Sequence, residues 1–147
     1  MTKEVWITVC GLQNGPETDG EPIEITTAGE YYYKNEKHYI LYEEVMEGEI
    51  HTTKNRIKIA PGMLELKKNG VVNVHMLFEE HQKNVTHYHT PYGSLEMGID
   101  TKQVEICENE NELTVKVDYA LEMNQEFVAD CNIKIVVQSK GIKSFKI

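Results

Sequence analysis

The sequence predicts an all-β protein, an antiparallel meander β-barrel of about eight to ten strands in one domain that spans residues 1–147. Two observations support this prediction. Apolar and polar residues alternate with a period of two through most of the chain, as they do in strands with one buried face. Short clusters of Gly, Pro and Asn separate these segments, and no stretch of helical length shows a 3.6-residue period.

The first half of the chain contains five predicted strands and the start of a sixth. Gly29 lies inside the second strand and indicates a bulge or a sharp bend. Asn69-Gly70 is the strongest hairpin signal, because both residues tolerate positive φ in a type I′ turn, and it predicts a return strand that starts at Val72. The first three strands are predicted at residues 5–9, 23–33 and 38–47. The fourth is predicted to end at residue 59, and the fifth to start at residue 64.

The second half of the chain shows the clearest alternation. Residues 113–123 and 127–137 each place apolar side chains on one face, and a short hairpin loop at 124–126 joins them. The apolar phase changes near Asp100-Thr101-Lys102, which predicts a bulge or turn there. Residues 76–83 are compatible with a short helix as well as a strand.

Charge and cysteine content narrow the choice of partner and compartment. Acidic residues outnumber basic ones by 24 to 15, giving a net charge of −9, so we expect neither nucleic acid nor an anionic membrane as a partner. The N-terminal residues contain no signal-peptide pattern, and the three cysteines form no CxxC motif. We therefore expect a cytoplasmic protein whose Cys10, Cys107 and Cys131 are buried, reduced thiols.

Several short patterns carry a resemblance to a known family. They are Trp6, Thr8, Gly11 and Gln13; Thr27, Gly29 and Tyr31; Thr53, Ile57 and Ile59; Gly70, Met76, Phe78 and Glu79; and the run Tyr88 to Gly93 with Leu95 and Thr101. Together they resemble the YwiB-like family of uncharacterised Firmicute proteins, a domain of unknown function, over essentially the whole chain. The resemblance implies a calycin-like, and so lipocalin-like, β-barrel, and it implies no activity. It raises the expectation of a ligand cavity only by analogy of fold.

Two features separate the chain from better-known barrel families. Lipocalins begin with Gly-x-Trp, whereas Trp6 here follows Glu4-Val5. Intracellular lipid carriers hold a fatty-acid head group with a pair of arginines and a tyrosine. Arg56 is the single arginine of this sequence, so that clamp cannot form.

Tyrosines are the most suggestive candidates for a ligand site. A cavity lined by rings and hydroxyls suits a small apolar or amphipathic ligand, and we predict a non-enzymatic binding module of this kind. The simpler alternative is that these tyrosines are ordinary strand residues with buried rings and wet hydroxyls. The predicted ligand-binding residues are Tyr31, Tyr33, Tyr42, Arg56, Tyr88 and Tyr92.

Two other function classes stay open at this stage. The first is a protein–protein interaction module, including a homodimer that pairs through a strand edge or an aromatic outer face. The second, less favoured, is a metal-dependent enzyme at the barrel mouth, because His87 and His89 share one face of a strand and Glu79 is a candidate carboxylate. No catalytic residue, metal ligand or cofactor is predicted, since two histidines are a weak signal.

Overall fold

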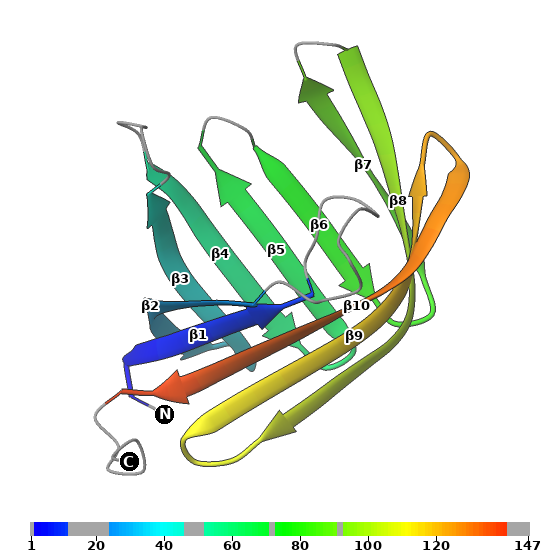
Figure 1. Ribbon diagram of the computed structural model, residues 1–147. Helices are drawn as coiled ribbons and strands as arrows, with labels where there is room; N and C mark the ends of the chain where they lie inside the picture. The colour runs from blue at the N-terminus through cyan, green and yellow to red at the C-terminus, as the bar shows by residue number, and fades with distance from the viewer. Residues whose placement is uncertain (1, 12–23, 46–51, 71–72, 91–92, 141–147) are drawn as a thin grey trace.

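The computed structural model describes residues 2–11, 24–45, 52–70, 73–90 and 93–140. Within them the chain forms ten antiparallel strands that curl into a nearly closed barrel (Figure 1). This confirms the predicted all-β meander barrel. The strands are β1 (Glu4–Cys10), β2 (Glu24–Lys34), β3 (Lys37–Val45), β4 (Thr52–Ala60), β5 (Met63–Asn69), β6 (Val74–Glu79), β7 (Lys83–Thr90), β8 (Gly93–Glu108), β9 (Glu112–Met123) and β10 (Glu126–Ser139).

The strands are joined in the order β6-β5-β4-β3-β2-β1-β10-β9-β8-β7. Consecutive strands pair with each other except β6 and β7. The first and last strands, β1 and β10, also pair, so they lie side by side in the middle of the sheet. The barrel wall is therefore discontinuous between β6 and β7. Hydrogen bonds close one end of this seam: His81 N donates to Thr101 O at 2.9 Å, and Val104 N donates to a Glu80 carboxylate oxygen at 3.0 Å.

Two of the hairpin turns have the geometry that the right-handed twist of strands favours. Asn35-Glu36 joins β2 to β3 with φ of 53° and 62°, and Asn124-Gln125 joins β9 to β10 with φ of 50° and 72°. Two consecutive positive φ angles in a two-residue loop are typical of type I′ turns. The hairpin predicted at residues 124–126 is confirmed.

The type I′ turn predicted at Asn69-Gly70 is wrong. Strand β5 ends at Asn69, β6 begins at Val74, and Lys68 pairs with Val74, so the connection is longer than two residues. Neither Asn69 nor Gly70 has a positive φ. The reason is local contact: a Cβ at Gly70 would lie 2.5 Å from Oγ1 of Thr53, so this glycine serves close approach to β4 rather than left-handed backbone.

The irregular points of the sheet follow the sequence signals more closely. The register of β8 against β9 shifts between Thr101 and Gln103, which confirms the bulge predicted near residues 100–102. Residues 76–83 complete β6, turn, and enter β7, so the strand alternative is the correct one there. A second shift, between Phe127 and Ala129 of β10, was not predicted.

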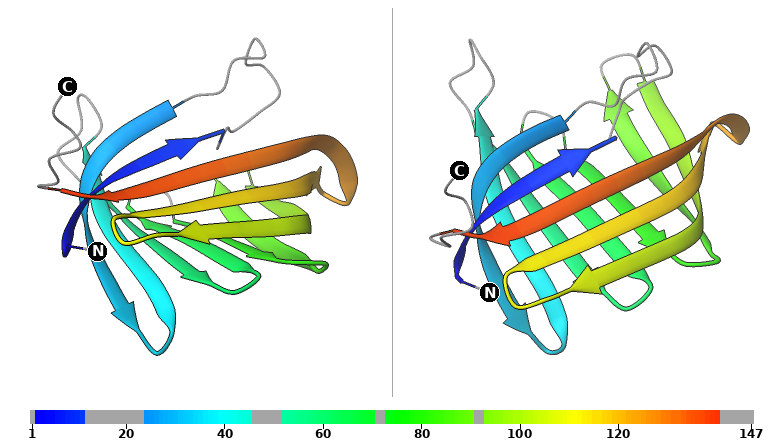
Figure 2. Two further views of the ribbon diagram at one scale, coloured as in Figure 1. Left: turned by 90° about the horizontal axis from the view of Figure 1, so that it is seen from below. Right: turned by 60° about the horizontal axis from the view of Figure 1, so that its bottom comes forward.

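Gly29 marks a corner of the barrel. Residues 24–30 of β2 pair with β1, whereas residues 30–34 pair with β3, and the strand curves strongly between the two (Figure 2). A Cβ at Gly29 would lie 2.4 Å from Cδ1 of Ile7 and 2.7 Å from the carbonyl oxygen of Leu41. The predicted bend is therefore present, without a register shift, because only glycine fits between these two walls.

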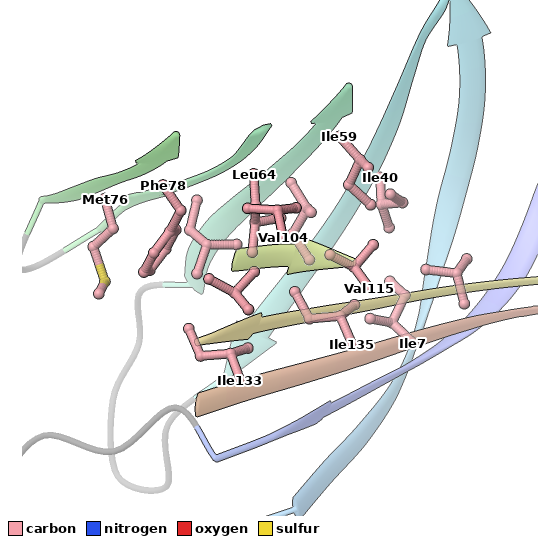
Figure 3. Packing of buried hydrophobic residues seen from close by; sticks show 14 of the residues in the cluster. Ile7, Ile40, Ile59, Leu64, Met76, Phe78, Val104, Val115, Ile133 and Ile135 are labelled. Atoms are coloured by element: carbon pink, nitrogen blue, oxygen red, sulfur yellow. The ribbon is translucent and has the colours of Figure 1, made fainter. Parts of the chain in front are cut away.

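The core fills one half of the barrel. We call the end with the turns Asn35-Glu36 and Pro61-Gly62 the base, and the end where β3 stops and β4 starts the mouth. Most side chains that point inward in the base half are fully buried, and Figure 3 shows several of them packed from opposite walls. Tyr31 and Ile106 are only partly buried there. The largest fully buried side chains are Phe78, Ile7, Ile40, Ile57, Ile59, Leu64, Ile99, Leu113, Ile133, Ile135, Val5 and Val115.

Several inward-facing apolar side chains nearer the mouth are only half-buried, whereas Met97 is buried. Val9, Val74, Leu121, Met123 and Cys131 pack against the core but keep part of their surface accessible. The apolar side chains are thus more completely buried in the base half than toward the mouth.

Candidate functional site

A polar cluster lies inside the barrel at the mouth. Tyr42, Asn55 and Lys68 form one row across β3, β4 and β5, because Asn55 is the register partner of both of the others. Glu44 lies two residues beyond Tyr42 on the same face of β3. Its Oε1 accepts hydrogen bonds from Nδ2 of Asn55 at 2.9 Å and from Nζ of Lys68 at 3.3 Å. We call Tyr42, Glu44, Asn55 and Lys68 the mouth cluster.

Asn55 has an unusual position in this cluster. Only 4% of the residue is exposed, yet its Oδ1 atom is buried without a hydrogen-bond partner. The amide orientation is fixed by its other end, since exchanging the oxygen and nitrogen would put the amide oxygen against the Glu44 carboxylate. Asn55 is one of the residues around a void of about 10 Å³, which is lined by Val9, Tyr42, Asn55, Arg56, Ile57, Leu66, Lys67 and Lys68. Such a void holds about one water molecule.

Tyr42 keeps its proton at ordinary pH. Burial of the ring, and then the negative charge of Glu44, raise the pKa of the Tyr42 phenol above its usual value. The mouth cluster therefore contains one carboxylate, one ammonium group and two neutral groups. Its formal charges cancel through the ion pair between Glu44 and Lys68.

A larger hollow of about 610 Å³ lies at the corner where β2 leaves β3. Most of its lining residues belong to the outward-facing phase of the strands, so it opens on the outside of the barrel. They are Ala28, Gly29, Glu30, Leu41, Tyr42, Glu43, Lys54, Asn55, Arg56 and Asn69. Arg56 contributes here and forms an ion pair with Glu65 at 3.5 Å.

A second polar group closes the base of the barrel. The Tyr31 hydroxyl and Nδ1 of His38 share a hydrogen bond of 2.7 Å, and Nε2 of His38 lies 3.8 Å from a Glu108 carboxylate oxygen. His38 is 7% exposed. Burial lowers the pKa of His38, and the Glu108 charge only partly opposes this effect. His38 is therefore neutral at neutral pH, and it is a packed, hydrogen-bonded residue at the base of the barrel.

Comparison with known proteins places the chain in a family. Residues 7–135 match the family model described as "Domain of unknown function (DUF1934)". The chain belongs to the DUF1934 family. It is 28% identical over 128 residues to the uncharacterized beta-barrel protein YwiB of Bacillus subtilis strain 168, covering 86% of this chain and 88% of YwiB.

The solved structure of a family relative has the same fold. The crystal structure of the ywiB protein from Bacillus subtilis superposes on this DUF1934 chain with a TM-score of 0.72 at 22% identity. The match covers 93% of this chain and 92% of that one. The predicted family resemblance is confirmed. The finer likeness to calycins and lipocalins stays a prediction.

In the structure of this DUF1934 member, the residues that the sequence predicts as ligand contacts do not lie together in one site. Tyr42 alone lies in the mouth cluster. Tyr31 is engaged with His38 at the base, Tyr33 is 60% exposed, and Arg56 is directed to the outer face through its pair with Glu65. For Tyr88 only the backbone is described, and Tyr92 lies outside the described residues. Their role as ligand contacts stays a prediction.

The structure also shows where the histidines of the predicted metal site and the three cysteines lie. His87 is exposed on β7, with its Nε2 atom 3.7 Å from a Glu96 carboxylate oxygen, and the side chain of His89 is not described. No three His, Cys, Asp or Glu side chains in the described ranges form a group that could hold a metal ion. The prediction of three buried thiols is wrong for Cys107, which is exposed, and too strong for Cys10 and Cys131, which are half-buried.

Sequence reasoning missed Glu44, Asn55 and Lys68. A usable signal was present, because Asn55 shares the inward phase of Ile57 and Ile59, and a polar residue in a buried phase needs a partner. Which partner it meets depends on the register of three strands, and that register is visible only in the fold. Among the described residues, no helix is long and apolar enough to cross a membrane. The cytoplasmic location stays a prediction.

Proposed function

We propose that this DUF1934 member is a binding module that holds a small amphipathic ligand in the mouth half of the barrel. The apolar part of the ligand lies against the half-buried wall, and its polar part reaches the mouth cluster. The observation that carries the proposal is the buried Oδ1 of Asn55, which has no partner although the residue is only 4% exposed.

The free energy of an unpaired buried acceptor supports this reading. Leaving such a group unsatisfied costs about 1–3 kcal/mol, so native structures rarely keep one without a water or ligand. One water would fill the void of about 10 Å³ that Asn55 helps to line. A lone water does not account for the half-buried apolar wall formed by Val9, Leu121 and Met123, and an amphipathic ligand accounts for both features.

A neutral fluorescent probe tests this proposal. N-phenyl-1-naphthylamine is apolar, carries one N–H donor, and brightens when it leaves water. We expect saturable brightening with one probe per chain. Leu121→Gln, which makes the interior wall polar, weakens binding by about tenfold. Phe127→Gln on the same hairpin is the matched control, because Phe127 is 64% exposed, and it leaves binding unchanged.

Folding of the variants is checked by circular dichroism and by the urea midpoint. If Leu121→Gln does not fold, Cys131→Phe is the second test, because it fills the half-buried interior with an apolar side chain. Brightening that does not saturate, or that is lost in the Phe127 variant and kept in the interior variants, contradicts the proposal and indicates adsorption on the outer surface.

A further inference from the structure

The outer face of β4 and β5 is positively charged, although the chain as a whole is acidic. Lys54, Arg56 and Lys58 share the outward phase of β4, and Lys67 lies directly opposite Arg56 on β5. We call these four residues the basic face. Glu65 is the only carboxylate among the outward-facing residues of the two strands, so this face has a formal charge of +3 in a chain with a net charge of −9.

Glu65 does not neutralise the basic face. One of its carboxylate oxygens lies 3.5 Å from Nη2 of Arg56, and the other lies 2.6 Å from Nε2 of His75 on β6. Within the described residues, the ammonium groups of Lys54 and Lys67 form no ion pair or hydrogen bond, and Nε of Arg56 is buried without a partner. Like charges that lie opposite each other on a sheet reduce its stability, so an anionic partner would relieve this repulsion.

The hollow of about 610 Å³ beside the basic face gives it a concave edge. Lys54 and Arg56 line this hollow together with Leu41, which is 37% exposed and lies directly opposite Arg56 on β3. Apolar and charged groups are therefore exposed side by side on the outside of the barrel. A partner could place an apolar side chain against Leu41 and negative charges against the lysines.

The small size of the basic face favours a peptide over a nucleic acid. From Lys54 to Lys58 the face spans about 14 Å along β4. Carboxylates border it, because Glu43 lies directly opposite Lys54 and Glu30 lines the same hollow. A nucleic-acid strand carries a negative charge at every nucleotide and would extend over these carboxylates. A short peptide segment with two or three carboxylates fits within the face.

We propose that the basic face and the adjoining hollow are a docking surface for an acidic segment of another protein, one that also carries an apolar side chain. The partner's carboxylates pair with the Lys54 and Lys67 ammonium groups, for which the described residues supply no counter-ion. Its apolar side chain packs against Leu41. The surface lies on the outside of the barrel, so this proposal is independent of the ligand proposed for the interior.

Three blocked hexapeptides of equal length test the proposal. The first alternates Glu with Leu, and in the other two Gln or Lys replaces every Glu. Each is titrated into isotope-labelled protein and followed by the backbone amide signals in NMR spectra. The ionic strength is about 0.1 M, where charges more than about 10 Å apart are largely screened. We expect saturable shifts on β4 and β5, and an affinity for the Glu-Leu peptide at least about tenfold higher than for either analogue.

Two double variants assign the binding to the basic face. Lys54→Gln with Lys67→Gln removes the two lysines without counter-ions and should weaken binding of the Glu-Leu peptide by about tenfold or more. The matched control is Lys116→Gln with Lys134→Gln, which removes the same charge. These two lysines are exposed and lie directly opposite each other on β10 and β9, and their loss should leave the affinity within about twofold.

Several results would overturn the proposal. Equal binding of the Gln-Leu peptide would show that charge does not select the partner. Equal losses in the two double variants, or amide shifts confined to strands other than β3, β4 and β5, would place binding elsewhere. A short oligouridylate that binds more tightly than the Glu-Leu peptide would identify nucleic acid as the partner instead. Circular dichroism checks that the variants fold; if one does not, the wild-type shifts and the three peptides still decide.

Discussion

The corner at Gly29 permits a quantitative test of the fold around the site. Gly29→Ala adds one methyl group between the two walls that meet there, beside Tyr42. That Cβ would lie 2.4 Å from Cδ1 of Ile7, 2.7 Å from the carbonyl oxygen of Leu41 and 3.2 Å from Cβ of Tyr42. Two of these contacts are closer than real Cβ atoms approach. The Leu41 oxygen belongs to the backbone and cannot retreat without disturbing the pairing of Glu30 with Leu41.

Overpacking a closed interior by one methyl group costs about 1–3 kcal/mol. Alanine also restricts the unfolded chain, which returns about 0.4–1 kcal/mol because the φ of Gly29 is not positive. We therefore expect Gly29→Ala to lower the free energy of unfolding by about 1–2 kcal/mol. The assay is urea unfolding followed by circular dichroism. The midpoint should fall while the m-value stays constant.

A double-mutant cycle identifies the contact responsible. Ile7→Val removes the Cδ1 atom that the new methyl group meets, and alone it costs about 0.5–1.5 kcal/mol because Ile7 is fully buried. In the Gly29→Ala background the same change should cost less, by a coupling free energy of about 0.5 kcal/mol or more. Gly98→Ala is the control, since its nearest contact is the Lys83 side chain at 3.3 Å. An undiminished midpoint in Gly29→Ala, together with zero coupling, would refute this account of the corner.

Three further predictions concern the base and the turns. Phe78→Ala should lower the free energy of unfolding by about 3–5 kcal/mol, measured by urea denaturation, because Phe78 is 0% exposed and its ring meets Tyr119 edge-on with centroids 4.9 Å apart. Gln125→Gly should raise that free energy by about 1 kcal/mol in the same assay, because φ is 72° there; a loss of stability contradicts it. Burial lowers the folded-state pKa of His38, so its contribution to stability is complete above its unfolded pKa of about 6.5 and is lost as pH falls toward the folded value. Measured across this pH range, the free energy of unfolding should decrease as the pH falls in the wild type, and it should decrease less in His38→Gln.

The strand pattern was predictable because it depends on local alternation. Strands β9 and β10 place apolar side chains at every second residue, and burial follows that phase along most of their length. The bulge near Thr101 was predictable for the same reason, since a change of apolar phase requires an extra residue. The turn at Asn69-Gly70 was not, because the contact of Gly70 with Thr53 outweighs the local preference of the dipeptide.

The candidate site was predictable only in part. Tyr42 was named from its residue type, but Tyr31 has the same type and phase and is bound to His38 instead. What distinguishes them is the partner across the strand pair, Asn55 for Tyr42 and Ile40 for Tyr31. Strands β3, β4 and β5 are consecutive, but local alternation does not specify the register between them, so the contacts among Glu44, Asn55 and Lys68 become visible only in the fold.

The central claim is that the mouth half of the barrel interior receives a ligand. The most direct measurement is a methyl NMR spectrum of protein labelled at Leu and Val, titrated with N-phenyl-1-naphthylamine. The account predicts saturable shifts at Val9, Val74 and Leu121, with little change at Val115, which is fully buried in the base half. Shifts confined to the exposed Val85, or no saturable shift at any methyl group, would contradict it.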